Sequence, residues 1–362
     1  MPEPLDIALR KADHLALATS GDVGFVQKTA LWEEVDFLHD ALPEAAVAEV
    51  DLRVDWLGKR LRAPFVIAAM TGGTPEAEAI NRDLAAAAEA HGIGFCFGSQ
   101  RPLLTRGIEA GYRVRDVAPT TLVVGNIGIV QAGAVPTQRL RDLVAFSGAD
   151  ALAIHLNPGQ EMAQPGGDRD FRGGLSTIRR VIEELGVPVL VKETGCGISR
   201  AVGERLAGAG VKWIDAGGAG GTSWIAVEMH RAQDEERAIA ERFRDWGIPT
   251  AASVAGLGGL GAALCATGGV ANGLDAAKAL AIGATCVGVA RPLLQARARG
   301  PAQLNRAILD LIAELRTAML LTGCRTVSDL HTLQLVLGER LLRWVPKAAP
   351  VRARAVGGLA AP

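Results

Sequence analysis

Short apolar runs alternate with longer amphipathic stretches over most of the 362-residue chain. Eight of these runs lack polar alternation, which is the pattern of strands whose two faces are both covered in a parallel sheet. The predicted strands are residues 65–70, 94–97, 121–126, 151–156, 188–192, 211–215, 264–267 and 285–289. Stretches with helical periodicity lie between them, at residues 76–90, 175–185, 203–209 and 274–282.

Eight strand–helix units within about 230 residues favour an α/β fold of the (β/α)8 TIM-barrel type. An open doubly wound sheet is the alternative, but no GxGxxG turn follows the first strand. We expect a single domain over residues 1–346, with an N-terminal extension (1–64) that includes a helix at 5–18. The barrel spans 65–300, and C-terminal helices at 302–321 and 327–345 complete the domain (301–346). The Ala-, Pro-, Gly- and Arg-rich tail (347–362) is predicted to be mobile.

Composition excludes several classes of function. The 38 basic and 39 acidic residues give a net charge of −1, and aromatic residues make up only 4%, which argues against a nucleic-acid binder. Five scattered cysteines without a CxxC pair indicate neither a zinc site nor a disulfide framework. Residues 248–274 carry no charge, but their seven glycines favour a buried turn–strand–loop over a membrane span. We therefore expect a soluble, cytoplasmic protein.

Candidate chemistry gathers where the predicted strands end, which is where (β/α)8 enzymes place their active sites. Glycine-rich loops follow the last two strands, at residues 268–271 and 288–291. Such loops leave backbone N–H groups available to surround a phosphate, and in barrels that hold FMN this is the position of the flavin phosphate. The alternative is that these glycines only form tight turns.

Four other positions each have at least one functional interpretation and one purely structural one. Lys192 could be a Schiff-base nucleophile, a phosphate ligand or a cation beside a flavin ring, or it could simply pair with Glu193. Glu161, in the polar loop 157–171, could ligate Mg²⁺ or lie in an ordinary surface loop. His155 could be a ligand or a core histidine. The basic cluster around Arg10, Lys11 and His14 could meet an anionic substrate together with Arg101, or it could be a solvated helix face.

Taken together, the motifs resemble those of the type 2 isopentenyl-diphosphate isomerases. They occur in order from Arg10 to about Trp344: RKADH, FVIAAMTGG, INRDLA, GSQR, VGNIG, HLNPGQEMAQP with GDRDF, VKETGCG, GGAGGTSW, TGGVANGLDAAKALAIGA, VGVARP and LTGC. The resemblance implies an enzyme of isoprenoid biosynthesis that interconverts isopentenyl and dimethylallyl diphosphate by a 1,3-proton shift. It also implies reduced FMN as the acid–base group, NADPH to keep FMN reduced, Mg²⁺, and a homo-oligomer, either a tetramer or an octamer.

The resemblance also assigns roles to individual residues. Gln160, Lys192 and His155 would be catalytic, and Glu161 would bind the metal. The substrate would contact Arg10, Lys11, Ser99, Gln100, Arg101, Asn157 and Gln160, with His155 beside them. FMN would contact Ala69, Met70, Thr71, Ser99, Asn126, Lys192, Gly217, Thr222, Gly269, Val270, Ala271, Ala290 and Arg291.

Three positions depart from the family's pattern. Gly166 replaces a glutamate beside the metal loop, Ala271 replaces an arginine near the flavin phosphate, and Gly217 replaces a serine. These departures keep open a flavin-binding homologue that has lost catalysis. An FMN-dependent α-hydroxy-acid oxidase or dehydrogenase is a further alternative. That chemistry needs a histidine base and arginines in an RHGxD-like stretch after strand 7, where this chain has GGVANGLD.

Overall fold

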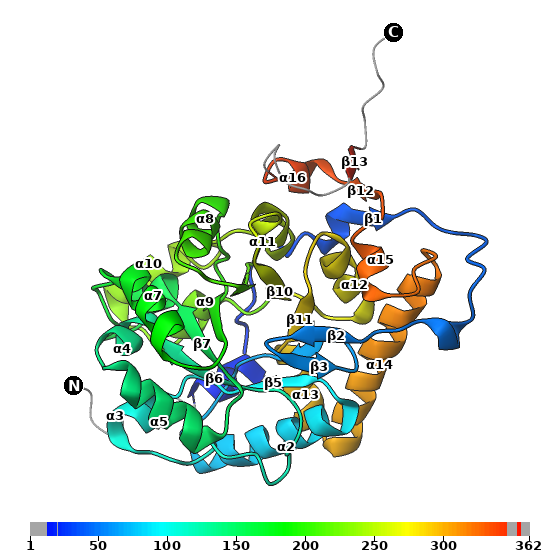
Figure 1. Ribbon diagram of the computed structural model, residues 1–362. Helices are drawn as coiled ribbons and strands as arrows, with labels where there is room; N and C mark the ends of the chain where they lie inside the picture. The colour runs from blue at the N-terminus through cyan, green and yellow to red at the C-terminus, as the bar shows by residue number, and fades with distance from the viewer. Residues whose placement is uncertain (1–12, 20, 346–352, 356–362) are drawn as a thin grey trace.

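The computed structural model describes residues 13–19, 21–345 and 353–355. Eight parallel strands close into a barrel, and helices surround it (Figure 1). The barrel closes where Val287 of the last strand pairs with Phe65 of the first. The strands are β4 (Phe65–Ile67), β5 (Gly94–Cys96), β6 (Val123–Gly128), β7 (Ala151–Leu156), β8 (Val189–Glu193), β9 (Trp213–Asp215), β10 (Ala263–Thr267) and β11 (Cys286–Val289). All eight predicted strands are confirmed, and the fold is a (β/α)8 barrel.

The helices between the strands include those that periodicity predicts. These are α2 (Pro75–His91), α7 (Gly174–Glu184), α8 (Arg200–Gly208) and α12 (Gly273–Ala281). The remaining helices of the barrel are α3 (Arg101–Arg106), α4 (Ile129–Gly133), α5 (Thr137–Ser147), α6 (Pro158–Ala163), α9 (Trp224–Met229), α10 (Asp234–Arg242), α11 (Thr250–Leu257) and α13 (Arg291–Ala298). Four of these, α3, α4, α6 and α9, are short helices at the ends of strands, where they carry polar residues into one region.

The uncharged segment 248–274 corrects one prediction. A turn–strand–loop was expected, but the segment forms helix α11 before strand β10. Every residue of α11 is buried, so the helix has no polar face and no amphipathic period to reveal it. Among the helices of the described residues, none has both the length and the apolar character required to cross a bilayer.

The N-terminal extension contributes small elements at the periphery. They are η1 (Trp32–Glu34), β1 (Val35–Phe37), η2 (Val47–Glu49), β2 (Val54–Trp56) and β3 (Lys59–Leu61). β2 and β3 form an antiparallel hairpin. Residues 13–19 are helical, in agreement with the second half of the helix predicted at 5–18, and residues 1–12 lie outside the described part of the chain.

The C-terminal region contains one further correction. Helix α14 (Pro301–Leu320) was predicted, but the expected helix at 327–345 is replaced by α15 (Val327–Leu330), β12 (Leu335–Leu337) and α16 (Glu339–Leu342). β12 pairs with β1 on one side and with β13 (Ala353–Ala355) on the other. The three residues of β13 belong to the tail that was expected to be mobile. Backbone pairing with a strand edge requires no particular side chains, so the composition of the tail did not reveal it.

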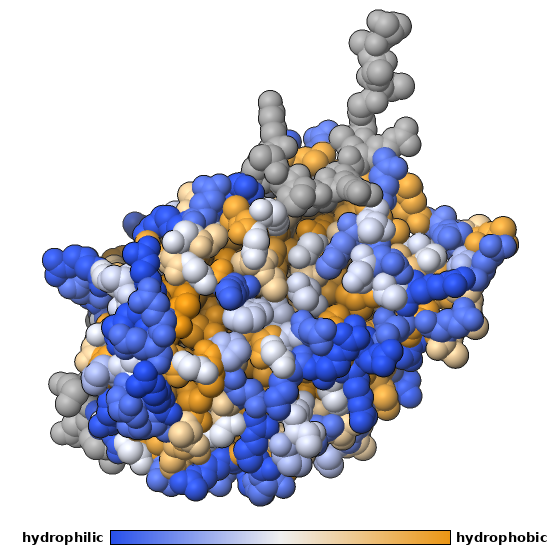
Figure 2. Space-filling model, in the orientation of Figure 1, coloured by the Kyte–Doolittle hydropathy of each residue, from blue (hydrophilic) through white to orange (hydrophobic). Residues whose placement is uncertain are grey.

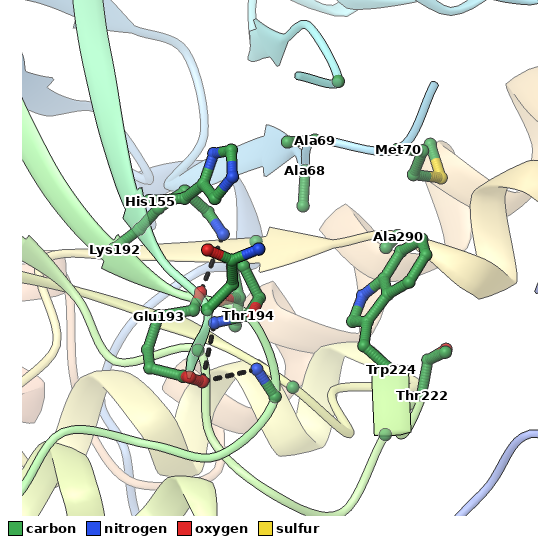
Figure 3. A pocket seen from close by; sticks show the side chains of 18 of the residues that line it. Ala68, Ala69, Met70, His155, Lys192, Glu193, Thr194, Thr222, Trp224 and Ala290 are labelled. Carbon is green, nitrogen blue, oxygen red and sulfur yellow. Dashed lines mark hydrogen bonds between the residues drawn. The ribbon is translucent and has the colours of Figure 1, made fainter. Parts of the chain in front are cut away.

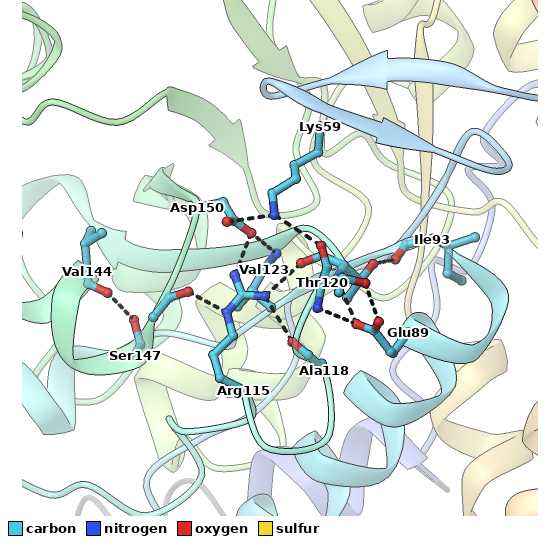
Figure 4. A network of polar contacts seen from close by, with 12 residues as sticks. Lys59, Glu89, Ile93, Arg115, Ala118, Thr120, Val123, Val144, Ser147 and Asp150 are labelled. Atoms are coloured by element: carbon cyan, nitrogen blue, oxygen red, sulfur yellow. Dashed lines mark hydrogen bonds and ion pairs between the residues drawn. The ribbon is translucent and has the colours of Figure 1, made fainter.

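A polar network lies at the end of the barrel where the strands begin (Figure 4). Arg115 donates to the carbonyl oxygens of Gly148 (2.7 Å), Ala118 (3.0 Å) and Thr121 (2.9 Å), and its guanidinium pairs with Asp150 at 2.6 Å. Lys59 from the β2–β3 hairpin also contacts Asp150, at 3.2 Å. The network therefore fastens the hairpin and two loops to the base of the barrel.

Candidate active site

A cavity of about 610 Å³ opens at the carboxyl ends of the barrel strands. Its volume lies within the range of cofactor and ligand sites in enzymes. Residues at the end of every strand line it, beginning with Met70 after β4 and ending with Ala290 after β11. Figure 2 shows one face of the molecule, where hydrophilic side chains predominate toward the edges and apolar ones are more frequent toward the middle. The cavity is where the sequence predicted the active site.

One end of the cavity is suited to a phosphate group. Gly269, Val270, Ala271 and Arg291 line it. Gly269 has φ +71°, and a Cβ there would lie 2.8 Å from the carbonyl oxygen of Gly220, so only glycine fits this close approach. Because no side chain extends from Gly269, backbone groups form the cavity wall at this point.

Arg291 adds a cation to the same end. Its Nη2 donates to the carbonyl oxygen of Gly21 at 2.7 Å, whereas its buried Nε has no hydrogen-bond partner among the described residues. A buried N–H group without an acceptor is costly, and an anionic oxygen would relieve that cost. The cavity thus fits the phosphate of FMN on two counts, the backbone wall and this Nε.

Lys192 lies at the end of β8, beside His155 on the neighbouring strand β7. In Figure 3, these two side chains occupy one side of the cavity, opposite Met70, Trp224 and Ala290. Lys192 Nζ donates to the main-chain oxygen of its neighbour Glu193 at 2.7 Å. The lysine therefore remains at the cavity wall and does not turn toward the carboxylate of that residue.

The Glu193 carboxylate is buried beneath the same wall. Its Oε2 accepts hydrogen bonds from the backbone N–H groups of Thr194 (2.6 Å), Gly195 (2.6 Å) and Gly197 (3.2 Å), and from that of Cys196. Burial raises the pKa of Glu193 to about 7, and the backbone hydrogen bonds oppose that rise. The carboxylate organises the loop that supplies Thr194 and Gly195 to the cavity.

Two residues at the end of β9 and just after it, Asp215 and Gly217, lie against Lys192 and Glu193. Burial raises the pKa of Asp215, and the charge on Lys192 opposes that rise. Gly217 has φ +49°, and a Cβ at this position would collide with the carbonyl group of Glu193. The serine usual in the resembled family would therefore not fit this backbone.

His155 has a defined orientation. Its Nδ1 lies 2.9 Å from Asn126 Oδ1, and the Asn126 Nδ2 donates to the carbonyl oxygen of Phe97 at 3.1 Å. Since that bond directs the amide oxygen toward the imidazole, Nδ1 carries the proton and Nε2 is the acceptor in the neutral ring.

Helix α6 brings three predicted residues together. Glu161 is buried, and its Oε1 accepts from Asn157 Nδ2 at 3.0 Å. Gln160, on the same turn, lines the cavity with them. The described residues contain no group of three His, Cys, Asp or Glu that could hold a metal ion. A Mg²⁺ ion held by Glu161 would therefore need oxygen ligands from substrate and water, which is usual for this ion.

Glu228, on α9, was missed by the sequence reasoning. It is fully buried, and its carboxylate contacts His14 Nε2 (2.9 Å), Gln160 Nε2 (3.0 Å) and Arg231 Nη1 (2.8 Å). Burial alone would raise the pKa of Glu228, but hydrogen bonds from His14 and Gln160 and the charge on Arg231 hold it below its ordinary value. Its spacing of four residues from Trp224, the last residue of the GGAGGTSW motif, was the available signal.

Most of the predicted site residues that the structure describes line the cavity, and two of them, Gln100 and Thr71, do not. Gln100 is fully buried and its Oε1 accepts from the backbone N–H of Asn126 at 2.8 Å. Thr71 is buried beside a small adjoining cavity of about 60 Å³. Arg10 and Lys11 lie outside the described residues. Those that line the cavity are Ala69, Met70, Ser99, Arg101, Asn126, His155, Asn157, Gln160, Glu161, Lys192, Gly217, Thr222, Gly269, Val270, Ala271, Ala290 and Arg291.

Comparison with known proteins yields two kinds of similarity. The FMN-dependent dehydrogenase family model matches residues 8–111 and 156–336. The chain is 43% identical to the isopentenyl-diphosphate delta-isomerase of Methanosarcina mazei over 334 residues, which cover 91% of each protein. It is 42% identical to that of Methanothermobacter thermautotrophicus over 342 residues, covering 94% of this chain and 96% of the relative.

Solved structures show the fold alone. A mandelate oxidase variant with a monooxide FMN adduct superposes with a TM-score of 0.62 at 19% identity, covering 89% of this chain and 95% of that one. A putative lactate oxidase of Pediococcus acidilactici gives a TM-score of 0.66 at 15% identity, covering 92% and 95%. At these identities the similarity establishes a shared barrel and carries no statement about the substrate.

Proposed function

The chain belongs to the isopentenyl-diphosphate delta-isomerases within the FMN-dependent dehydrogenase family, and from this premise we propose that it interconverts isopentenyl and dimethylallyl diphosphate by a 1,3-proton shift. One observation carries the proposal: a single cavity is lined both by the glycine-rich backbone with Arg291 and by Arg101 with the α6 residues, and Lys192 and His155 line the same cavity. The backbone wall with Arg291 suits a flavin phosphate, and Arg101 with the α6 residues suits a substrate diphosphate.

FMN fits the first end of this cavity. The residues of the cavity that would hold it are Ala69, Met70, Ser99, Asn126, Lys192, Gly217, Thr222, Gly269, Val270, Ala271, Ala290 and Arg291. Bound in its reduced state, FMN supplies the acid–base group that a proton shift on an alkene requires. Lys192 would place a cation against the flavin ring, and we propose NADPH as the reductant that keeps the cofactor active.

The protein's own residues would bind and orient the substrate. Arg101 and a Mg²⁺ ion on Glu161 would hold the diphosphate, with Asn157 fixing the Glu161 carboxylate. Arg10 and Lys11 are proposed to add charge from the N-terminal segment. His155 and Gln160 would face the hydrocarbon end, where the ionised Glu228 orients the Gln160 amide.

The test is anaerobic turnover of isopentenyl diphosphate with FMN, NADPH and Mg²⁺, compared between the wild type and Glu161→Gln. We expect conversion to dimethylallyl diphosphate that collapses in the variant, because the amide is a poor ligand for Mg²⁺. Absence of conversion by a wild-type protein that carries reducible FMN would refute the assignment.

Oxidation of an α-hydroxy acid is not favoured. The loop after β10 contains neither the histidine nor the arginine that this chemistry uses, and His155 on β7 is oriented by Asn126. We expect no reduction of the bound flavin by mandelate or lactate. The family resemblance also supports a homo-oligomer, which sedimentation equilibrium would test.

A further inference from the structure

One carboxylate outside the cavity touches two side chains that line it. Asp168 Oδ2 accepts a hydrogen bond from Gln131 Nε2 at 2.7 Å and lies 3.5 Å from Arg101 Nη1. Arg101 begins α3 after β5, Gln131 belongs to α4 after β6, and Asp168 follows α6 after β7. A single side chain therefore joins three successive β/α units at the cavity rim.

The backbone of the same residue holds the proposed metal ligand. The Asp168 N–H donates to Glu161 Oε2 at 2.8 Å. The preceding turn brings it there, because the N–H of Gly167 donates to the carbonyl oxygen of Gln164 at 2.9 Å. A Cβ at position 167 would collide with the carbonyl group of Glu161, so the turn requires glycine.

The two contacts of Asp168 differ in strength. The bond to Gln131 is short, whereas 3.5 Å is long for a charge-assisted hydrogen bond. Among the described residues, Asp168 is the carboxylate that contacts the Arg101 guanidinium. The long contact keeps the arginine near the rim and leaves its donors available for a stronger anion.

We propose that Asp168 is a positioning residue that sets Arg101 and Glu161 together, so that a diphosphate and its divalent cation bind as one unit. The inference rests on the proposed function, since it names how that site takes its substrate. Two other roles make different predictions. If Asp168 merely repelled anions, removing its charge would strengthen diphosphate binding. If it merely stabilised the loop, removing it would not change the affinity for one ligand more than for another.

The experiment measures binding of inorganic pyrophosphate to the FMN-loaded enzyme by titration calorimetry, with and without Mg²⁺. For Asp168→Ala we expect the affinity in Mg²⁺ to fall roughly 10-fold, since one charge-assisted network is lost. The gain in affinity that Mg²⁺ provides should shrink as well. Asp168→Asn keeps an acceptor for Gln131, so its affinity for pyrophosphate should lie between those of the wild type and Asp168→Ala.

Asp170 provides a matched control. It lies in the same loop, is exposed, and pairs with Arg172 at 2.6 Å without touching the rim residues. Asp170→Asn should bind pyrophosphate as the wild type does. The flavin absorbance spectrum should be the same in all variants, because the side chains that Asp168 contacts, those of Arg101, Gln131 and Glu161, are not among the residues assigned to FMN.

A double-variant comparison with Glu161→Gln decides the mechanism. If Asp168 acts through Glu161, Asp168→Ala should add little in the Glu161→Gln background. Unchanged or tighter binding by Asp168→Ala, or full additivity with Glu161→Gln, would overturn the inference while the proposed function stands. A wild type that binds no pyrophosphate in Mg²⁺ would overturn both, whereas pyrophosphate binding without isopentenyl diphosphate turnover would refute the isomerase function alone.

Discussion

The two ends of this barrel use charge in opposite ways. Where the strands begin, Arg115 donates to three carbonyl oxygens and to Asp150, so most of its hydrogen-bonding capacity is used within the protein (Figure 4). Where the strands end, Arg291 has a buried Nε without a partner among the described residues, and Arg101 has one long contact to a carboxylate. Charges that are satisfied internally stabilise the fold, whereas charges left with spare donors are available to a ligand.

The largest expected effect is on catalysis, at the open end. Lys192→Met should lower kcat by roughly 100- to 1000-fold, because it removes the cation at the centre of the cavity wall. The variant should still bind FMN, since the phosphate end is unaltered. Anaerobic turnover together with the flavin absorbance of the purified protein measures both. Lys59→Met, at the end where the strands begin, is the control and should retain the wild-type kcat. A loss of kcat in Lys59→Met comparable to that in Lys192→Met would contradict the difference between the two ends.

The next effect is on stability, at the end where the strands begin. Arg115→Ala should lower the free energy of unfolding by about 3 kcal/mol, because it leaves three carbonyl oxygens without this donor and removes the closest cation from Asp150. Urea unfolding measures this loss, and kcat per folded molecule should stay unchanged. Arg60→Ala removes an exposed pair with Asp55 and should cost less than about 1 kcal/mol. Equal costs for the two variants would contradict the comparison.

A pH dependence should come from Glu193. Its pKa in the folded protein, about 7, lies above its ordinary value of 4.5, so the folded state binds the proton more tightly than the unfolded state. Stability should therefore decline as the pH rises from 4.5 through 7 and level off above 7, by roughly 3 kcal/mol in total. Glu193→Gln should lack this contribution in urea unfolding at pH 5 and pH 8. Identical pH profiles for the wild type and Glu193→Gln would show that the buried carboxyl does not titrate in this range.

The smallest effect concerns the flavin phosphate. Ala271→Arg returns a cation to a position where the family usually has one, and we expect FMN to bind roughly 5-fold more tightly. Fluorescence titration with FMN measures this, and riboflavin, which has no phosphate, is the matched ligand that should gain nothing. An equal gain for both ligands would place the effect on the flavin ring and away from the phosphate.

Several features of the molecule could be predicted from the sequence because their signals are local. An apolar run without polar alternation identifies each strand of a covered parallel sheet, and all eight were found in this way. Gly269 and Gly217 belong to motifs at strand ends, and the required backbone conformation is visible in the residue type itself. Asn157 directly precedes the short helix that carries Gln160 and Glu161, so the proximity of the three follows from their spacing.

Other features were decided by tertiary structure. Glu228 lies 68 residues from Gln160 along the chain, yet their side chains are hydrogen-bonded. Asp168 meets Arg101 across 67 residues, and β12 pairs with β1 from the other end of the chain. No local pattern records such pairs, because each partner taken alone is an ordinary polar or apolar residue.

The sequence by itself thus determined which segments are strands, where the glycine loops fall and which residues occupy the strand ends. The tertiary structure decided which polar groups face the cavity and which are bonded within the wall, as the Gln100 Oε1 is to the backbone N–H of Asn126. The physical reason is that closing the barrel brings eight strand ends into one small volume. Whether a side chain there remains available depends on neighbours contributed by other strands.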